Sequence, residues 1–190
     1  MMPAAHSCDV PRKLWTRAEA HALADLGFPN AEKLELIDGE LIDRMGKKHA
    51  HVFWHHLVLA WLQAKFGEEY VRTESPIDVS TEDNPKSEPE PDLVVTARSI
   101  REYTTNPSPQ ELRLVIEISD STVEYDLQGK APIYARAEIV EYWVIDIPGR
   151  QVHVHRAPVL GVYTSIVKYG FTDKITPLAD TDAPFCMERL

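Results

Sequence analysis

The chain has 190 residues, of which 44% are apolar and 26% are charged. This length fits one domain with a buried core, and the apolar fraction is too high for a disordered chain. The 30 acidic residues outnumber the 20 lysines and arginines, so the net charge of −10 excludes a broad basic surface for nucleic acid. The longest uninterrupted apolar run, Leu57 to Leu62, is too short to span a membrane.

The first residues and the two cysteines bear on where the protein works. Met1 to His6 contain no basic segment followed by an apolar one, so we expect no secretion signal. Cys8 and Cys186 lie at opposite ends of the sequence and lack the spacing of metal ligands. These features predict a cytoplasmic protein that works in a reducing environment.

A helix is predicted close to the N-terminus. Thr16 and Glu19 have the spacing of a capping box, in which each side chain accepts a main-chain hydrogen bond at the start of a helix. The helix should run to about Leu26, where a glycine follows. We therefore expect residues 1–30 to form a helical extension and residues 31–190 to form a single domain.

Two strands, a helix and a further strand should follow. Asp38-Gly39 tolerates the positive φ angles of a tight turn and predicts a hairpin of Leu34 to Ile37 with Glu40 to Asp43. Apolar residues then recur at three- and four-residue spacing from about His51 to Phe66, which is a helical pattern. The segment from Val71 to Ser80 has the composition of a strand.

The middle of the chain contains two apolar runs, Asp92 to Thr96 and Leu112 to Ile118. Each has apolar residues on both faces, so other elements should cover both faces. Ser121 to Glu124 has the form of a second capping box and opens a helix that should reach about Ala137. Pro132 removes one donor inside this helix and predicts a kink or an early end.

The last third of the chain returns to strands. Tyr142 to Ile147 and Val152 to Arg156 flank Pro148-Gly149, which predicts a type II turn, and Tyr163 to Tyr169 is a further strand. Because strands and helices are mixed and hairpins dominate, the fold class is α/β in the mixed α+β sense.

The two apolar runs of the middle segment also carry the most informative pattern. Two carboxylates within one cross-strand spacing, about 5 Å between Cβ atoms, repel and require a cation, a proton or a basic side chain. Such oxygen-rich ligation suits Mg²⁺ or Mn²⁺ rather than zinc. Antiparallel pairing about the midpoint between the runs places these residues opposite one another: Asp92 and Glu117, Val94 and Val115, and Thr96 and Arg113.

A basic partner for the acidic pair lies on the next predicted helix. Asp126, Lys130 and Tyr134 follow at four-residue steps and share one helix face, which can bring the Lys130 ammonium to Glu117. An alternative remains open, in which Asp92 and Glu117 only end their strands. Lys130 would then be a surface lysine paired with Asp126.

At these residues the sequence resembles the Uma-type restriction endonuclease family, which belongs to the PD-(D/E)XK nuclease superfamily. The resemblance extends from about Glu32 to Tyr169. The matching motifs, in chain order, are Leu34 to Leu41, the histidine-led helix after it, Pro91-Asp92, Val115 to Ser119, Ser121, Asp126, Lys130, Tyr134 and Glu141 to Asp146.

The resemblance implies a restriction endonuclease-like core, in which helices flank a mixed sheet with extra C-terminal hairpins. It implies a Mg²⁺ or Mn²⁺ site in which Asp92 and Glu117 bind the metal, with Ile118 as a further ligand. The superfamily's lysine, expected two residues after the glutamate, is absent because Ser119 stands there. In the Uma-type pattern the lysine moves to the following helix, which matches Lys130.

The implied activity is metal-assisted hydrolysis of phosphodiester bonds in DNA, with a homodimer expected by analogy with the superfamily. Lys130 would orient the attacking water or stabilise the developing charge. Glu35, Glu40 and His49 are further candidates that complete the metal shell or position water, although both glutamates also fit a solvated hairpin edge. The basic cluster Lys47 to His49 is a candidate phosphate contact.

Two other functions stay open: a catalytically silent nuclease-like module for binding or assembly, and hydrolysis of a smaller phosphate ester. The acidic balance of the chain favours the silent module. A panel of substrates would separate hydrolysis of a smaller phosphate ester from cleavage of DNA.

The remaining histidines suggest a zinc site only weakly. His51 and His55 have the i,i+4 spacing of zinc ligands, but Val52 stands where the protease signature has glutamate. His153 and His155 alternate with apolar residues of a predicted hairpin and should face solvent.

Overall fold

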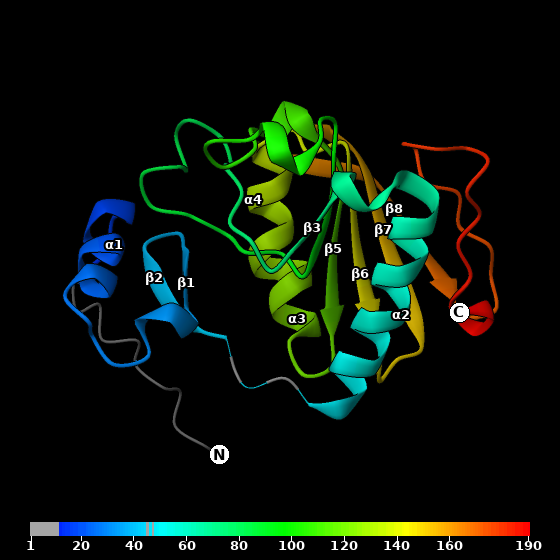
Figure 1. Cartoon of the computed structure of the whole chain (residues 1–190), viewed down its shortest axis with the longest axis horizontal. Helices are drawn as coiled ribbons and strands as arrows, with labels where there is room; N and C mark the ends of the chain where they lie inside the picture. Colours follow the sequence, from blue (N-terminus) through cyan, green and yellow to red (C-terminus); the bar gives the residue numbers. More distant parts are fainter. Residues whose placement is uncertain (1–11, 45, 47) are drawn as a thin grey trace, which may run out of the picture.

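The computed structural model describes residues 12–44, 46 and 48–190, and Figure 1 shows how their elements are arranged. The predictions about Met1 to His6, Cys8 and Lys47 concern residues outside these ranges. The strands are β1 (Leu34–Ile37), β2 (Glu40–Asp43), β3 (Val71–Thr73), β4 (Leu93–Thr96), β5 (Leu112–Ser119), β6 (Glu141–Asp146), β7 (Gln151–Val159) and β8 (Val162–Gly170).

The α-helices are α1 (Arg17–Asp25), α2 (His49–Phe66), α3 (Val123–Tyr125) and α4 (Ala131–Arg136), with a π-helical turn, Asp126–Lys130, between the last two. Short 3₁₀ segments are Ala31–Lys33, Glu68–Tyr70, Ile100–Glu102, Pro109–Glu111 and Met187–Arg189. None of the helices in the described ranges combines the length and apolar character that a membrane span needs.

The main sheet has six strands in the order β3-β4-β5-β6-β7-β8, and β1 and β2 form a separate hairpin. Among the described strands, β5 and β6 are the one parallel pair of this sheet, and the segment from α3 to α4 connects them. Helix α2 lies on one face of the sheet and α3 and α4 lie on the other (Figure 1). The predicted mixed α/β class is therefore confirmed.

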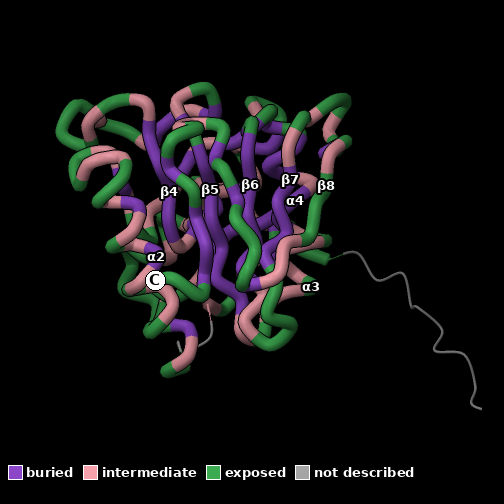
Figure 2. The backbone as a smooth tube through the Cα atoms, turned by 90° about the vertical axis from the view of Figure 1, so that its right-hand side faces the viewer, coloured by how far each residue is buried: buried purple, intermediate pink, exposed green. Residues whose placement is uncertain are grey.

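Two apolar cores, one on each face of the sheet, explain why the central strands are apolar throughout. Val58 and Leu62 of α2 pack on the face that carries Ile116 of β5. Ile133 of α4 packs on the opposite face, against Val115. Figure 2 shows the central strands as mostly buried along their length.

The N-terminal elements form largely where the sequence predicts them. Thr16 and Glu19 make the capping box of α1. Asp38 and Gly39 form the hairpin turn with φ angles of 48° and 82°. A Cβ on Gly39 would lie 2.9 Å from Cβ of Leu14, so this turn requires glycine for space as well as for conformation.

The hairpin is joined to the main sheet through the segment that leads into β4. Leu36 of β1 forms an isolated antiparallel bridge with Glu88. The Glu88 N–H donates to the Leu36 carbonyl at 2.7 Å, and the Gly39 N–H donates to the Lys86 carbonyl at 2.7 Å. The chain that enters β4 is thereby fixed by the hairpin before it reaches the sheet.

The predicted strand from Val71 to Ser80 is too long. Strand β3 ends at Thr73, and Glu74 adopts a φ angle of 47°, which turns the chain out of the sheet. The residues that follow are irregular as far as β4.

The helix after β5 differs from the prediction in two ways. Thr122 rather than Ser121 precedes its first turn, and the hydroxyl of Thr122 donates to Asp126 instead of capping the helix, so the expected capping box is wrong. The helix does not end at Pro132, because this residue lies in the first turn of α4, which continues to Arg136. The irregularity is the π-helical turn before it.

The turn between β6 and β7 is not type II. That turn needs a positive φ at its third residue, but Arg150, not Gly149, has the positive φ of 51°. The Asp146 carboxylate accepts the Gly149 N–H at 2.8 Å, and a Cβ on Gly149 would lie 2.1 Å from that carboxylate. Any other residue at this position would have to displace the Asp146 carboxylate.

His153 and His155 are buried, so the prediction that they face solvent is wrong. Their face of β7 is the one that α4 covers, and the rings of Tyr142 and Tyr163 lie 5.4 and 5.5 Å from the ring of His155. Burial lowers the pKa of His155 to about 4. The prediction assumed that only one face of this hairpin is buried, but both faces are packed.

The C-terminal tail covers the α2 side of the sheet. Phe185 packs on Trp61 of α2 with ring centroids 4.8 Å apart. The tail is also held by Glu141 at the start of β6, whose buried carboxylate accepts from the Leu178 N–H at 2.7 Å and from Nε of Arg156 at 2.8 Å.

Candidate functional site

A cleft of about 620 Å³ opens where β4 begins and β5 ends. Most of the side chains that line it are charged, and they come from the hairpin, the start of α2, the two strands and the helix after β5. The lining residues used below are Lys33, Glu35, Arg44, Lys48, His51, Glu90, Asp92, Glu117, Ile118, Asp126 and Lys130.

Asp92 lies directly before β4, and its carboxylate is fixed from two sides. The main-chain N–H of Ile118 donates to Oδ2 at 2.8 Å. Nε2 of His51 lies 3.1 and 3.2 Å from the two carboxylate oxygens. An ionised carboxylate only accepts hydrogen bonds, so Nε2 is the protonated nitrogen of this imidazole.

The strand register that the sequence predicts is confirmed where it matters for the cleft. Val94 lies opposite Val115, as expected. Thr96 lies opposite Leu112 rather than Arg113, because the register shifts by one residue after Val95. This irregularity is at the far end of the pair, so it leaves the end that carries Asp92 unchanged.

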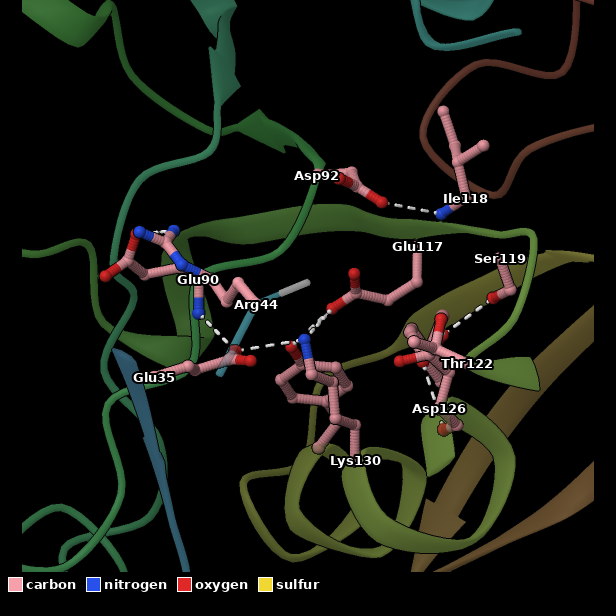
Figure 3. Close-up of polar contacts among 12 residues, drawn as sticks. Glu35, Arg44, Glu90, Asp92, Glu117, Ile118, Ser119, Thr122, Asp126 and Lys130 are labelled. Atoms are coloured by element: carbon pink, nitrogen blue, oxygen red, sulfur yellow. Dashed lines mark hydrogen bonds and ion pairs between the residues drawn. The ribbon is translucent and has the colours of Figure 1, made fainter. Parts of the chain in front are cut away.

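Glu117 projects from β5 into the same cleft as Asp92 (Figure 3). Its Oε1 accepts from Nζ of Lys130 at 2.9 Å and from the hydroxyl of Tyr134 at 3.1 Å. Burial raises the pKa of Glu117 well above its usual value, and nearby carboxylates, Asp126 and Asp92 among them, raise it further against the opposing effect of Lys130.

Lys130 is buried and lies between two carboxylates. Its Nζ is 2.9 Å from Oε1 of Glu117 and 2.9 Å from Oε1 of Glu35. Burial alone would lower the pKa of Lys130, but the surrounding carboxylates raise it well above its usual value. Lys130 is therefore an ammonium ion, and the alternative of a surface lysine is wrong.

The π-helical turn points Asp126 and Lys130 to the interior, and both are buried. The carboxylate of Asp126 accepts hydrogen bonds from the hydroxyls of Ser119 at 2.7 Å and Thr122 at 2.8 Å. Burial raises the pKa of Asp126. The predicted face of Asp126, Lys130 and Tyr134 thus exists and is turned toward β5.

Of the three further candidates, the structure brings only Glu35 into the cleft. Glu35 is buried, so the solvated alternative fails for this residue. Glu40 is exposed and forms an ion pair with Arg12 at 3.4 Å. It lies next to the hairpin turn, beyond the cleft. His49 is exposed at the first turn of α2 and stands apart from the lining residues.

Sequence reasoning missed two residues of the cleft. His51 was considered only as part of a zinc pattern, whereas its ring lies on Asp92. Glu90 is not among the candidates from the sequence, but its carboxylate pairs with Arg44, and burial raises its pKa. The alternation of Glu90 with Asp92 was a usable signal, whereas the contact of His51 depends on how α2 packs.

The donors in the cleft suit a hard divalent ion. Within the described residues, no three His, Cys, Asp or Glu side chains form a ready metal-binding group. Magnesium, however, is usually bound through one or two carboxylates, with water and substrate phosphate completing its shell. Asp92 and Glu117 supply two carboxylates that line one cavity, so the residues present fit such an ion.

Comparisons with known proteins bear on the fold and on the family of the chain. The fold is similar to the crystal structure of "a putative nuclease belonging to DUF820" from Anabaena variabilis, with 14% sequence identity and a TM-score of 0.66. The similarity covers 86% of this chain and 93% of that chain, so the fold class is that of this nuclease structure. Among curated proteins, no relative matches the sequence.

A family model described as "Uma2: Putative restriction endonuclease" matches residues 17–181. The chain belongs to this family, and the resemblance seen in the sequence is confirmed.

Proposed function

We propose that the protein is a divalent-metal-dependent endonuclease that hydrolyses phosphodiester bonds in DNA. One observation carries the proposal: the carboxylates of Asp92 and Glu117 line one cleft, and a buried ammonium, that of Lys130, lies on Glu117. Family membership supports the proposal, since the description of the family is "Putative restriction endonuclease".

In this proposal Asp92 and Glu117 hold a Mg²⁺ or Mn²⁺ ion together with Ile118. The Ile118 N–H points to Asp92, and the carbonyl of a strand residue leaves the chain on the same side as its N–H. The carbonyl of Ile118 is therefore the third oxygen donor on this side. When bound, the ion would neutralise charge at the scissile phosphate and lower the pKa of a water molecule.

Lys130 acts on the phosphate or on the water rather than on the ion. A fixed ammonium stabilises negative charge that develops in the transition state, and it costs little reorganisation when the surrounding carboxylates already hold it. Lys130 meets this condition because Glu117 and Glu35 both lie 2.9 Å from its Nζ.

The cleft rim carries the local basic groups that a chain of net charge −10 needs to hold a DNA backbone. Lys33, Arg44 and Lys48 line it. Lys48 also lies 3.5 Å from Asp120, an ion pair exposed enough to exchange for a phosphate.

A homodimer that presents one cleft to each DNA strand belongs to the same proposal, and sedimentation velocity tests it.

The test is cleavage of supercoiled plasmid by purified protein with Mg²⁺ or Mn²⁺. We expect nicked and linear products with the wild type. We expect a loss of at least about 100-fold in rate with Asp92→Asn and with Lys130→Met, since each removes a group that acts on the transition state. Cutting by both variants at the wild-type rate would indicate a contaminating nuclease. If the wild type does not cut DNA with any divalent ion, the proposal is refuted.

A second candidate function is a catalytically silent module that keeps the fold for binding or assembly. The observation that favours it is the pairing of Glu117 with Lys130, which compensates the buried charge without a metal ion. A calorimetric titration with Mn²⁺ separates the two functions, because the silent module binds no metal at millimolar concentration and the endonuclease does.

A further inference from the structure

Lys130 is held by two carboxylates that come from different parts of the fold. Glu117 belongs to β5 of the main sheet, whereas Glu35 belongs to β1 of the separate hairpin. Both carboxylates lie 2.9 Å from Nζ of Lys130, and the exposed fractions of the three side chains are only 3% for Glu35, 6% for Glu117 and 7% for Lys130. The lysine therefore bridges the hairpin and the sheet in a dry environment (Figure 3).

Glu117 alone is a poor anchor for this lysine. Its Oε1 lies 2.9 Å from the ammonium, but its carboxylate is one of the two proposed metal ligands. In the proposed function Glu117 also gives its charge to a divalent ion, which repels a neighbouring ammonium. A lysine tied only to a metal ligand would lose its partner at the moment when the site is loaded.

Glu35 is free of that conflict and is itself held in place. The same Oε1 that contacts Lys130 accepts the main-chain N–H of Glu90 at 2.7 Å. The Glu90 carboxylate pairs with Arg44, which follows β2. The hairpin thereby fixes both Lys130 and the segment that reaches Asp92 two residues after Glu90.

The geometry points to Glu35 as the positioning residue of Lys130, so that the hairpin β1–β2 completes the site. This inference rests on the proposed function. Among the described residues, Glu35 makes no hydrogen bond or ion pair with Asp92 or Glu117, whereas it contacts Lys130 directly. It acts through Lys130, whose ammonium it would hold toward the cleft with a divalent ion bound to Glu117.

The first arm of the test is nuclear magnetic resonance of the lysine side chains in protein labelled with ¹⁵N-lysine. A buried ammonium with fixed acceptors exchanges its protons slowly and gives an observable signal, which Lys130→Arg identifies by its loss. We expect Glu35→Gln, which keeps the side-chain volume and removes the charge, to broaden this signal beyond detection. Glu32→Gln, an equal change of charge at an exposed position just before β1, should leave it unchanged.

The second arm is cleavage of DNA at saturating Mn²⁺, which removes any effect on metal affinity. We expect Glu35→Gln to lower kcat by about 10- to 100-fold with KM for DNA unchanged, because misplacing a catalytic group costs rate rather than binding. Glu35→Asp keeps the charge but withdraws it by one methylene, so it should recover part of the rate. A residue with only a structural role would change the melting temperature of the variants without this split between kcat and KM.

The two arms separate this inference from the function on which it rests. A Lys130 signal that survives in both Glu35→Gln and Glu35→Asp overturns the positioning role, whatever the activity. A wild type that cuts no DNA, while its Lys130 signal still depends on Glu35, refutes the endonuclease and leaves the anchor supported. If Glu35→Gln does not fold, Glu35→Asp carries both measurements.

Discussion

The main-chain N–H of Ile118 donates a hydrogen bond of 2.8 Å to Oδ2 of Asp92. Asp92 lies just before β4, so this bond continues the pairing of β4 with β5 by a side chain where the main-chain pairing ends. The position of the first proposed metal ligand is thus set by the strand that carries the second, Glu117. The two carboxylates line the same cleft because of strand pairing rather than because of a flexible loop.

His51 should control how well Asp92 binds metal. Its ring fixes both carboxylate oxygens of Asp92, and loss of a residue that orients a metal ligand typically costs about 10- to 100-fold in affinity. We expect this loss for His51→Leu in a calorimetric titration with Mn²⁺. His56→Leu, at an exposed position of the same helix, is the control, and an equal affinity of both variants would argue against a role for His51.

Lys130 should be essential for stability as well as for cleavage. Lys130→Met leaves Glu117 and Glu35 buried without their cation, and breaking such a pair costs about 3–5 kcal/mol. We expect this decrease in the free energy of unfolding, measured in urea at pH 8 with chelator. Adding Glu117→Gln to the variant should recover part of the lost stability. A decrease below about 1 kcal/mol for Lys130→Met would contradict a charged buried cluster.

The anchor of the C-terminal tail provides a test away from the cleft. Arg156→Met removes the guanidinium from the fully buried carboxylate of Glu141, and we expect a loss of about 3–5 kcal/mol in the free energy of unfolding. Arg98→Met breaks an ion pair with Glu111 that is exposed to solvent, and it should cost much less. Similar losses in urea unfolding of the two variants would show that burial of Glu141 is unimportant.

The buried His155 predicts a loss of stability in mild acid. The unfolded chain binds a proton at His155 below its ordinary pKa of 6.5, whereas the folded chain does so only below a pKa of about 4. The stabilisation is fully present above pH 6.5 and falls with pH through this window, by on the order of 3 kcal/mol in total. Burial also lowers the pKa of His153, which acts in the same direction.

The check is the free energy of unfolding of wild type and of His155→Phe at several pH values between 4 and 7. Phenylalanine keeps the ring contacts with Tyr142 and Tyr163 and cannot bind a proton. The variant should therefore lose less stability than the wild type as the pH falls. Parallel curves would show that His155 is not responsible.

The fold was predictable where neighbouring residues decide it. The turn at Asp38-Gly39 and the helix start at Thr16 depend on local geometry, and both occur as expected. The register of β4 with β5 follows from the midpoint of their connection, although the shift after Val95 leaves no trace in the sequence. The orientation of His153 and His155 depended instead on a helix from another part of the chain.

The residues of the candidate site were likewise predictable only in part. Asp92, Glu117 and Lys130 come from consecutive elements, so register and helical spacing were enough to bring them together. Glu35 and His51 reach the cleft only because the hairpin and α2 pack over the end of the sheet. Such packing is decided by the whole core, and neither residue has a local pattern that distinguishes it from a solvated one.

The π-helical turn before α4 makes the number of residues in this segment as important as their identity. In the wide turn Asp126–Lys130 the Ala131 N–H bonds to the Asp126 carbonyl five residues earlier. Deleting one residue here, such as Gln128, would allow a regular α-helix and rotate the lysine to another side of it. Evolution can therefore exchange side chains in this segment more easily than it can shorten the segment.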